Sequence, residues 1–437
     1  MRKWLGRASV FAFAMISMGV SGARAGLDEY VKKPDPEFAW KETGKEVSEV
    51  GTVYSLDLTS QVWQGIPWNH NLRIYEPAQV EHPDEILLFI TGGSTTSRAS
   101  AKDHEMGFGL ARLCGARVAV LPQVPNQPLL GDKTEDTLIA ETFVRYLETK
   151  DENWPLLFPM VKSAVRAMDA VEAWSKENEK PAAKRFVVTG ASKRGWTTWL
   201  TGAVDKRVAG IAPMVIVMLN LKAQNANQLK VWGKYSEQID DYTNRGLMNR
   251  TDDADGKKLW EMVDPFFYRE RLTMPKLLIN GTNDRYWTLD AMDLYWDELK
   301  GSKSVVYLPD AGHGLDQHRD YALNGIGAFF RHVATDRPMP SLDWKFGGAE
   351  DGPLTLTLDS SPRPKSARIW TARSETRDFR ESKWEPSVLK VGPALTAEVA
   401  RPEQGNVAFF ADLEFEIEKI PYHLTTQIDQ TGEKPAR

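Results

Sequence analysis

Short apolar runs alternate with amphipathic stretches through the middle of the chain. The runs are rich in β-branched and large aliphatic side chains, as is typical of buried strands, and they lie at 85–90, 117–121, 186–189, 208–218, 276–280 and 305–308. Stretches with apolar residues at helical spacing lie between several of them, at 104–114, 134–149 and 160–177. Strands that alternate with helices predict an α/β fold with a mostly parallel, doubly wound sheet.

The pattern changes on both sides of this α/β region. Residues 51–77 alternate apolar and polar side chains, which predicts two antiparallel strands that open the sheet. After Pro338 the helical spacing disappears, and short alternating segments separated by turn residues follow. We therefore expect an α/β domain at 26–338 and, at 339–437, a small antiparallel β-sandwich of fibronectin or immunoglobulin type without catalytic groups.

Residues 220–271 interrupt the alternation of strands and helices. The segment is long, polar and rich in aromatic residues, and it lies between the predicted strands at 208–218 and 276–280. Insertions at this place shape the substrate pocket in many enzymes, which favours a lid or cap. The alternative is a helical excursion packed on the rim of the domain.

Residues 1–25 have the pattern of a secretory signal peptide. Basic residues occur among the first seven, residues 8–20 are apolar, and residues 23–25 read A-R-A, a typical cleavage signal. The apolar run is too short to span a bilayer, and no later stretch reaches the roughly 20 apolar residues needed. We expect an exported protein, periplasmic or secreted, that begins near Gly26 and has no membrane span.

Composition narrows the possible partners. The chain is 42% hydrophobic and 26% charged with a formal net charge of −5, which is typical of a globular protein. A nucleic-acid-binding domain would carry a basic stripe, so we expect no nucleic-acid partner. The single cysteine, Cys114, cannot form an internal disulfide, and the seven histidines are dispersed without ligand spacing on a helix. We expect neither a metal site nor a cofactor.

The most informative motif lies in the stretch R-F-V-V-T-G-A-S-K-R-G-W at 185–196. An apolar strand ends at Gly190, Ser192 follows, and helical character resumes at Trp196. A serine on a sharp turn between a strand and a helix is the arrangement that nucleophilic acyl transfer needs, because the turn exposes its hydroxyl. The spacing is G-x-S-x-x-G instead of the usual G-x-S-x-G, with Arg194 at the place of the second glycine. Taken alone, the motif would also fit a structural role, in which its small residues allow a helix to pack closely where it crosses a strand.

Two later residues favour the catalytic interpretation. Asp284 follows the strand at 276–280, and His313 lies between two glycines after the strand at 305–308. Either could be a turn residue. Serine, aspartate and histidine in this order, each beyond the carboxyl end of a strand, are typical of α/β-hydrolases. In such a triad the histidine takes the serine proton and the carboxylate fixes the histidine tautomer. We therefore predict a catalytic triad of Ser192, Asp284 and His313.

Further candidate residues surround this triad. The strand at 85–90 ends in T-G-G-S, and in α/β-hydrolases the loop at this place supplies one oxyanion donor. Paired glycines would also suit a simple turn that ends the strand. We expect the N–H groups of Lys193 and Gly93 to form the oxyanion hole, with the start of the helix assisting. The candidate substrate contacts are Arg194, Trp196 and Tyr286.

Four strings in the chain resemble the PhoPQ-activated pathogenicity-related protein family. They are W-P-L-L-F-P-M-V-K-S-A-V-R-A-M-D at 154–169, V-T-G-A-S-K-R-G-W-T-T-W-L at 188–200, P-K-L-L-I-N-G-T-N-D-R-Y-W at 275–287 and L-P-D-A-G-H-G at 308–314. The resemblance covers nearly the whole mature chain and implies an exported α/β-hydrolase-like domain with a β-rich tail. It implies little about the substrate, because the family is named for its regulation. Ser192, Asp284 and His313 match as the presumed triad.

These observations predict an exported serine hydrolase that acts through an acyl-enzyme. The Asn-Asp loop and the histidine beyond it resemble those of prolyl-oligopeptidase-type enzymes, which favours a peptide substrate. The basic pair Lys193 and Arg194 favours an acidic or sugar-linked ester. The partner would thus be a small-molecule, sugar-ester or peptide substrate. The alternative is a catalytically inactive hydrolase fold, exported as a binding or signalling protein linked to virulence.

Overall fold

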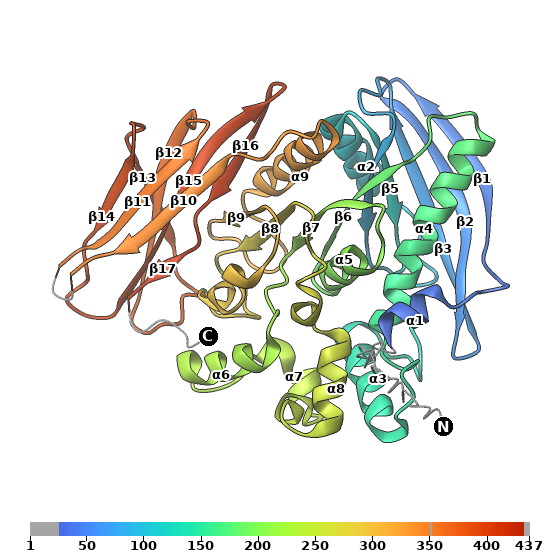
Figure 1. Ribbon diagram of the computed structural model, residues 1–437, viewed down its shortest axis with the longest axis horizontal. Coiled ribbons are helices and arrows are strands. Elements are labelled where there is room, and N and C mark those ends of the chain that lie inside the picture. The colour runs from blue at the N-terminus through green and yellow to red at the C-terminus, as the bar shows by residue number, and fades with distance from the viewer. Residues whose placement is uncertain (1–25, 350–351, 432–437) are drawn as a thin grey trace, which may run out of the picture.

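A single mixed sheet runs through the α/β region and on into the C-terminal region (Figure 1). The computed structural model describes residues 26–349 and 352–431, and the signal peptide expected at 1–25 lies outside them. Over these residues the strand order is β1-β2-β3-β5-β4-β6-β7-β8-β9-β16-β15-β12-β13, and β17 pairs with β15. The order reverses at β4 and β5, as in a doubly wound sheet.

The central strands are parallel, which confirms the predicted fold class. β5, β4, β6, β7, β8 and β9 pair in that order and in the same direction. Their bounds are β4 Glu85–Ile90, β5 Arg117–Leu121, β6 Arg185–Ala191, β7 Val208–Met214, β8 Lys276–Gly281 and β9 Lys303–Leu308. β7 is shorter than the apolar run at 208–218 predicted, because the chain turns away at Val215, whose φ is 46°.

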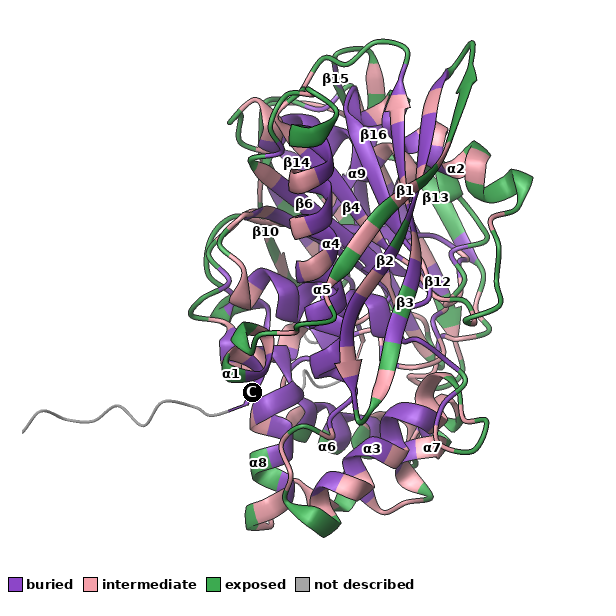
Figure 2. Cartoon of the chain, turned by 90° about the vertical axis from the view of Figure 1, so that its right-hand side faces the viewer, coloured by how far each residue is buried: buried purple, intermediate pink, exposed green. Residues whose placement is uncertain are grey.

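Helices cover both faces of the parallel strands (Figure 1). On one face α4 (Leu157–Glu177) packs against α5 (Lys193–Val204) and α1 (Leu27–Lys32). On the other face α2 (Ala101–Cys114) packs against α9 (Arg319–Ala334). Because side chains alternate across a strand, Ile86 and Leu88 of β4 face the first core and Leu87 faces the second. Figure 2 shows the resulting burial along the central strands.

The sheet opens with antiparallel strands. β2 (Gly51–Trp63) and β3 (Ile66–Pro77) form the predicted pair, and β3 continues antiparallel to β5. β1 (Ala39–Ser48) pairs with β2 at the edge and was not predicted. Its residues alternate only between intermediate and exposed positions, so the strand lacks the apolar face that would have marked it in the sequence.

The insertion at 220–271 is helical and lies beyond the carboxyl ends of the parallel strands (Figure 1). Two of its helices, α7 and α8, pack against α3 (Glu135–Thr149). The elements of the insertion are α6 Leu221–Trp232, η1 Glu237–Ile239, α7 Asp240–Thr243, η2 Leu247–Arg250, α8 Ala254–Val263 and η3 Pro265–Tyr268. Two further turns, η4 Ala291–Leu294 and η5 Trp296–Glu298, follow β8.

The C-terminal strands are antiparallel, as predicted. They form two layers that share a core of residues such as Leu356 and Leu358 on one side and Phe409 and Leu413 on the other. The three-stranded layer consists of β10 Ser341–Gly347, β11 Leu354–Ser361 and β14 Leu395–Val399. The other layer consists of β12 Ser366–Ser374, β13 Trp384–Val388, β15 Asn406–Ile417, β16 Ile420–Thr425 and β17 Asp429–Gln430.

The sandwich is joined to the α/β region through the sheet itself. Thr425 of β16 pairs with Val305 of β9, and the backbone N–H of Tyr307 donates to the Thr425 hydroxyl over 3.2 Å. α9 also packs on β16. The layer that contains β16, β15, β12 and β13 is therefore a continuation of the central sheet, which brings its connecting loops close to the ends of β8 and β9.

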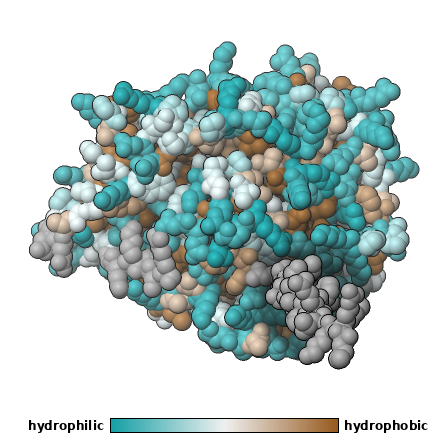
Figure 3. Space-filling view, in the orientation of Figure 1, coloured by the Kyte–Doolittle hydropathy of each residue, from teal (hydrophilic) through white to brown (hydrophobic). Residues whose placement is uncertain are grey.

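The face of the protein drawn in Figure 3 is largely hydrophilic. Figure 3 shows charged and polar side chains over most of the view, with apolar ones in small groups between them. Among the residues that the structure describes, no helix has the length and the hydropathy required to cross a membrane.

Candidate active site

Ser192 occupies a strained turn between β6 and α5. Its φ of 57° and ψ of −126° lie outside the regions that residues with a side chain usually adopt. Two glycines make room for this turn. A Cβ on Gly190 would lie 2.8 Å from the carbonyl oxygen of Arg194, and one on Gly195 would lie 2.9 Å from that of Gly190. Gly195 thus allows the close backbone packing that the second glycine of G-x-S-x-G allows, although it lies one position later in the sequence.

Asp284 and His313 are brought together by the loops after β8 and β9. His313 Nδ1 lies 2.8 Å from Asp284 Oδ2, and the other carboxylate oxygen accepts the backbone N–H of Tyr286 over 3.0 Å. The pair fixes the imidazole so that Nδ1–H donates and Nε2 is left to accept a proton. Nε2 is buried and has no hydrogen-bond partner within the described chain. Such an unsatisfied nitrogen calls for a functional explanation.

Ser192 and His313 line the same apolar recess at the carboxyl ends of the strands. The recess holds about 500 Å³ of empty space, open solvent at its mouth included. Trp196 from α5 and Tyr286 from the loop after β8, two of the predicted substrate contacts, also line it. The insertion contributes a third wall, made of Leu221, Ile239, Tyr242, Met248 and Trp260. A serine, a histidine and an apolar surface therefore face one volume.

Tyr286 covers the ring of His313. Its ring lies 4.1 Å from that of His313, centroid to centroid, at an interplanar angle of 31°. Burial, together with the negative charges of Asp136 and Asp284, raises the pKa of Tyr286, so the phenol stays neutral. A neutral ring stacked on an imidazole restricts its rotation without competing for the Asp284 carboxylate.

Two acidic residues at the start of α3 form part of the site that the sequence did not reveal. Glu135 and Asp136 accept the Lys193 ammonium, with Nζ–oxygen distances of 2.8 and 3.2 Å. Asp136 lines the recess and also accepts the Tyr242 hydroxyl over 2.9 Å. Acidic residues are common in the first turn of any helix, so nothing in the sequence marked these two.

Arg194 lies beside the recess but is not one of the residues that line it. Its guanidinium forms two parallel hydrogen bonds of 2.8 Å to the Glu135 carboxylate, and its Nε donates to the Val124 carbonyl. Burial opposes ionisation of Glu135, but the bonds and charges of Arg194 and Lys193 outweigh it and lower the pKa of Glu135. The side chain predicted to contact the substrate is thus engaged in a partly buried ion pair.

Arg194 also explains the glycine that precedes Gly93. A Cβ on Gly92 would lie 2.4 Å from the guanidinium of Arg194, so a larger residue there would push this guanidinium away from its present position. The loop that carries Gly93 begins where β4 ends, and Ile90 pairs with Gly190 on the neighbouring strand β6. Gly93 itself has a φ of 108°, which glycine adopts without strain. The two segments predicted to supply oxyanion donors therefore start from adjacent strand ends.

Lys193 is the first residue of α5, with its side chain directed to Glu135 and Asp136. The first N–H groups of a helix have no acceptor within the helix, so the backbone N–H of Lys193 is available to an oxyanion.

Three described residues, Glu81, His82 and Glu418, could together offer ligands to a metal ion. Glu81 and His82 precede β4, at the opposite edge of the sheet from the recess, and both glutamates already bind Arg331.

Two solved structures resemble this chain in fold, and a third protein resembles it in sequence. Acetyl xylan esterase 1 from a Thermoanaerobacterium species has 16% identity over 72% of this chain and 94% of that chain, at a TM-score of 0.49. An S-formylglutathione hydrolase from Agrobacterium tumefaciens has 12% identity over 68% and 100% of the two chains, at a TM-score of 0.46. Autocrine proliferation repressor protein A from Dictyostelium discoideum is 31% identical over 438 residues, which cover 92% of this chain and 88% of that protein. Residues 27–380 match the family described as PhoPQ-activated pathogenicity-related protein, and the chain belongs to this family.

Proposed function

We propose that the protein is a serine hydrolase that cleaves a small-molecule ester through a covalent acyl-enzyme. One observation carries the proposal. A serine held in a strained turn lines the same recess as a histidine whose Nδ1 is bound to a carboxylate and whose Nε2 has no partner within the described chain. Nucleophilic acyl transfer requires these three groups in these relations.

Each residue of the proposed site has its own role in the reaction. Ser192 Oγ forms a bond to the acyl carbon while its proton passes to His313 Nε2, and Asp284 stabilises the imidazolium. The N–H groups of Lys193 and Gly93 bind the oxyanion of the tetrahedral intermediate. The ester C–O bond then breaks, and His313 gives its proton to the departing alcohol. Water, deprotonated by His313, hydrolyses the acyl-enzyme and restores Ser192.

The recess favours an apolar group beside the scissile carbonyl. Trp196, Trp260 and Met248 line it together with the aliphatic residues that follow β7. We assign the insertion at 220–271 the role of a cap over this group, because five of its side chains line the recess. The partly buried pair of Arg194 and Glu135 supports the serine turn and does not bind the substrate. The sequence pattern of residues 1–25 supports export of the protein.

Labelling with a fluorophosphonate probe tests the proposal. The wild-type protein should be labelled at Ser192 and should hydrolyse p-nitrophenyl esters, whereas Ser192→Ala should not be labelled and should lose roughly 10⁴- to 10⁶-fold in kcat. Ser341→Ala, which removes an exposed hydroxyl in the C-terminal region, is the matched control. A folded wild-type protein that neither reacts with the probe nor hydrolyses esters would refute the assignment. Cleavage of peptides but not of esters would refute the substrate class.

A second function, that of an exported binding or signalling protein, is favoured by one finding. The relative from Dictyostelium is named an autocrine proliferation repressor, and the two chains align over most of their lengths. In that case the protein would bind a partner through its surface, and the triad would not catalyse a reaction. The same labelling experiment separates the two functions, because a signalling protein without catalysis has no need of a reactive Ser192.

A further inference from the structure

A second recess lies on the other side of His313, and its character is opposite to that of the first. It holds about 780 Å³ of empty space, open solvent included, and charged or polar side chains form most of its lining. Its walls come from the loops that follow β8 and β9 and from a segment of the C-terminal region, residues 380–383. His313 lines both recesses, whereas Ser192 lines the apolar one.

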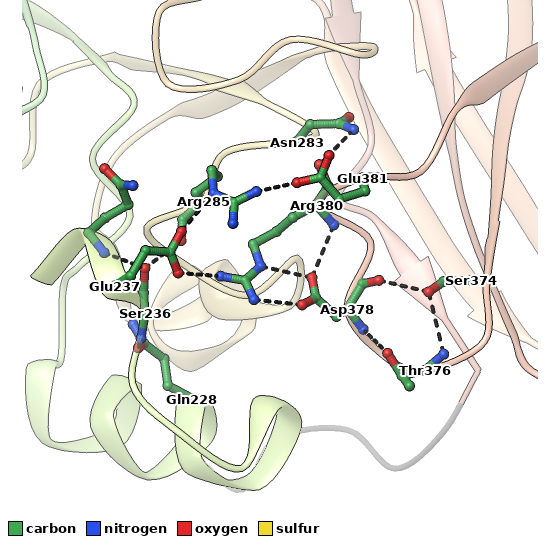
Figure 4. Close-up of polar contacts among 11 residues, drawn as sticks. Gln228, Ser236, Glu237, Asn283, Arg285, Ser374, Thr376, Asp378, Arg380 and Glu381 are labelled. Carbon is green, nitrogen blue, oxygen red and sulfur yellow. Dashed lines mark hydrogen bonds and ion pairs between the residues drawn. The ribbon is translucent and has the colours of Figure 1, made fainter.

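The C-terminal segment is fixed against the loops that follow β8 and β9, and Figure 4 shows its contacts with the first of these loops. The Asn283 amide, next to Asp284, donates to the carbonyls of Arg380 and Ser382 over 3.2 and 2.7 Å. The N–H of Trp384 donates to Asp310 Oδ1 over 3.0 Å, three residues before His313. These bonds hold the segment in one position relative to the Asp284–His313 pair. The C-terminal region therefore supplies a wall of the candidate active site.

The charges around this recess are balanced and mostly paired. Arg285 binds Glu237 over 2.6 Å and also contacts Glu381. Arg380 binds Asp378 through two bonds of 2.8 and 2.6 Å and lies 4.0 Å from the centroid of the Trp232 ring. A charged ligand would have to displace one of these partners. A neutral hydroxyl can donate to the carboxylates and accept from the arginines without breaking a pair.

The position of His313 decides which part of an ester enters which recess. In acyl transfer the histidine gives its proton to the leaving oxygen, so the leaving group must lie against His313. The acyl group must stay with Ser192, whose recess is apolar. The leaving alcohol then extends along His313 into the polar recess.

We propose that the recess between the two catalytic loops and residues 380–383 is a subsite for a neutral polyhydroxyl leaving group, such as a sugar. The inference rests on the proposed hydrolase function and names its substrate class: an ester of an apolar acid with a sugar. The C-terminal region completes this subsite without supplying a group to the chemistry. Glu381 and Lys383, each 84% exposed, project from the segment as its most accessible hydrogen-bonding side chains.

The test compares esters that share an acyl group and differ in the alcohol. The butanoates of glucose, of glucuronic acid and of hexanol are assayed with the wild type and with the double variant Glu381→Ala/Lys383→Ala. The wild type should prefer the glucose ester, and the double variant should raise its KM about tenfold, as expected for lost hydrogen bonds to charged groups. Hydrolysis of the hexanol ester should not change.

The double variant Lys365→Ala/Glu416→Ala is the control. It removes an exposed ion pair from the far end of the same sandwich and should leave all three rates unchanged. Equal rates for the glucose and hexanol esters, or an unchanged KM for the glucose ester in the first variant, would overturn the subsite and leave the hydrolase function standing. Preference for the glucuronate ester would overturn its neutral character. A wild type without any hydrolysis or fluorophosphonate labelling would overturn both proposals.

Discussion

Two histidine–aspartate pairs in this protein have nearly the same local geometry and different surroundings. His313 Nδ1 lies 2.8 Å from Asp284, and His423 Nδ1 lies 2.6 Å from Asp412. Each imidazole is stacked on a tyrosine, Tyr286 in the first pair and Tyr321 in the second, the latter at 3.7 Å between centroids. A carboxylate that orients a histidine is therefore not by itself evidence of catalysis.

The difference lies in what else the two pairs contact. The second oxygen of Asp412 accepts the Tyr321 hydroxyl and the Trp370 indole N–H, each over 3.1 Å, so this buried carboxylate takes three donors from the fold around it. The second oxygen of Asp284 accepts the N–H of Tyr286, which belongs to its own loop. His313 in turn faces the recess that Ser192 lines. The Asp412 pair joins α9 to the sandwich, whereas the Asp284 pair borders the recess that Ser192 also lines.

The sharpest test of this contrast is His313→Ala. Its removal should lower kcat for p-nitrophenyl butanoate by roughly 10⁴- to 10⁶-fold, because Ser192 then lacks a proton acceptor. The double variant Ser192→Ala/His313→Ala should be no slower than either single variant, since the members of a triad act as a unit. Circular dichroism checks the fold. Additive losses would show that the two residues act separately.

Asp284→Asn should be the next most severe change. An amide in place of the carboxylate favours the wrong imidazole tautomer, and a loss of about 10⁴-fold in kcat is expected. Asp412→Asn is the matched substitution at the second pair and should leave kcat unchanged per folded molecule. Steady-state rates, normalised to the concentration of folded protein checked by circular dichroism, measure both. Equal losses at the two positions would remove the distinction between the pairs.

The three residues of the proposed triad could be located in the sequence because each follows a strand that the local residues define. The apolar runs at 186–189, 276–280 and 305–308 are local signals, and the carboxyl ends of neighbouring parallel strands meet at one edge. The role of Arg194 could not be predicted, because its partner Glu135 lies 59 residues away and nothing local links the two. The same holds for Asn283 and the carbonyl of Ser382, which are 99 residues apart. β1 was not predicted for a different reason, its lack of a buried face.

A smaller effect is expected at Asn283, a positioning residue that connects the C-terminal region to the Asp284 loop. Asn283→Ala removes the two bonds to residues 380 and 382. Misplacement of a catalytic group is costly, and we expect kcat to fall about tenfold for every ester, with little change in KM. A fall in kcat with little change in KM distinguishes a positioning residue from Glu381 and Lys383, whose removal should raise KM for the glucose ester alone.

Asn406→Ala is the control for this variant, because it removes another side-chain amide bond to a backbone carbonyl, that of Glu375. Asn406→Ala should leave both constants unchanged. A rise in KM confined to the glucose ester in Asn283→Ala would show that Asn283 binds substrate and does not position Asp284. An unchanged kcat would show that the C-terminal segment has no influence on the pair.

The smallest effect on catalysis is expected at His423. His423→Ala should not change kcat, because Asp412 and its partners lie away from the serine. It should lower the free energy of unfolding by about 2 kcal/mol, since the buried Asp412 carboxylate loses one of its three donors. His423→Gln, which keeps an N–H donor, should recover part of that stability, and urea denaturation measures both variants. In His313→Ala the relative size of the two effects is reversed, with a large loss of activity and a small loss of stability. The loss of stability is small because this half-buried imidazole borders two recesses. A folded His423→Ala protein with tenfold lower kcat would show that the second pair contributes to the reaction, and the comparison between the two pairs would no longer distinguish a catalytic site from a structural one.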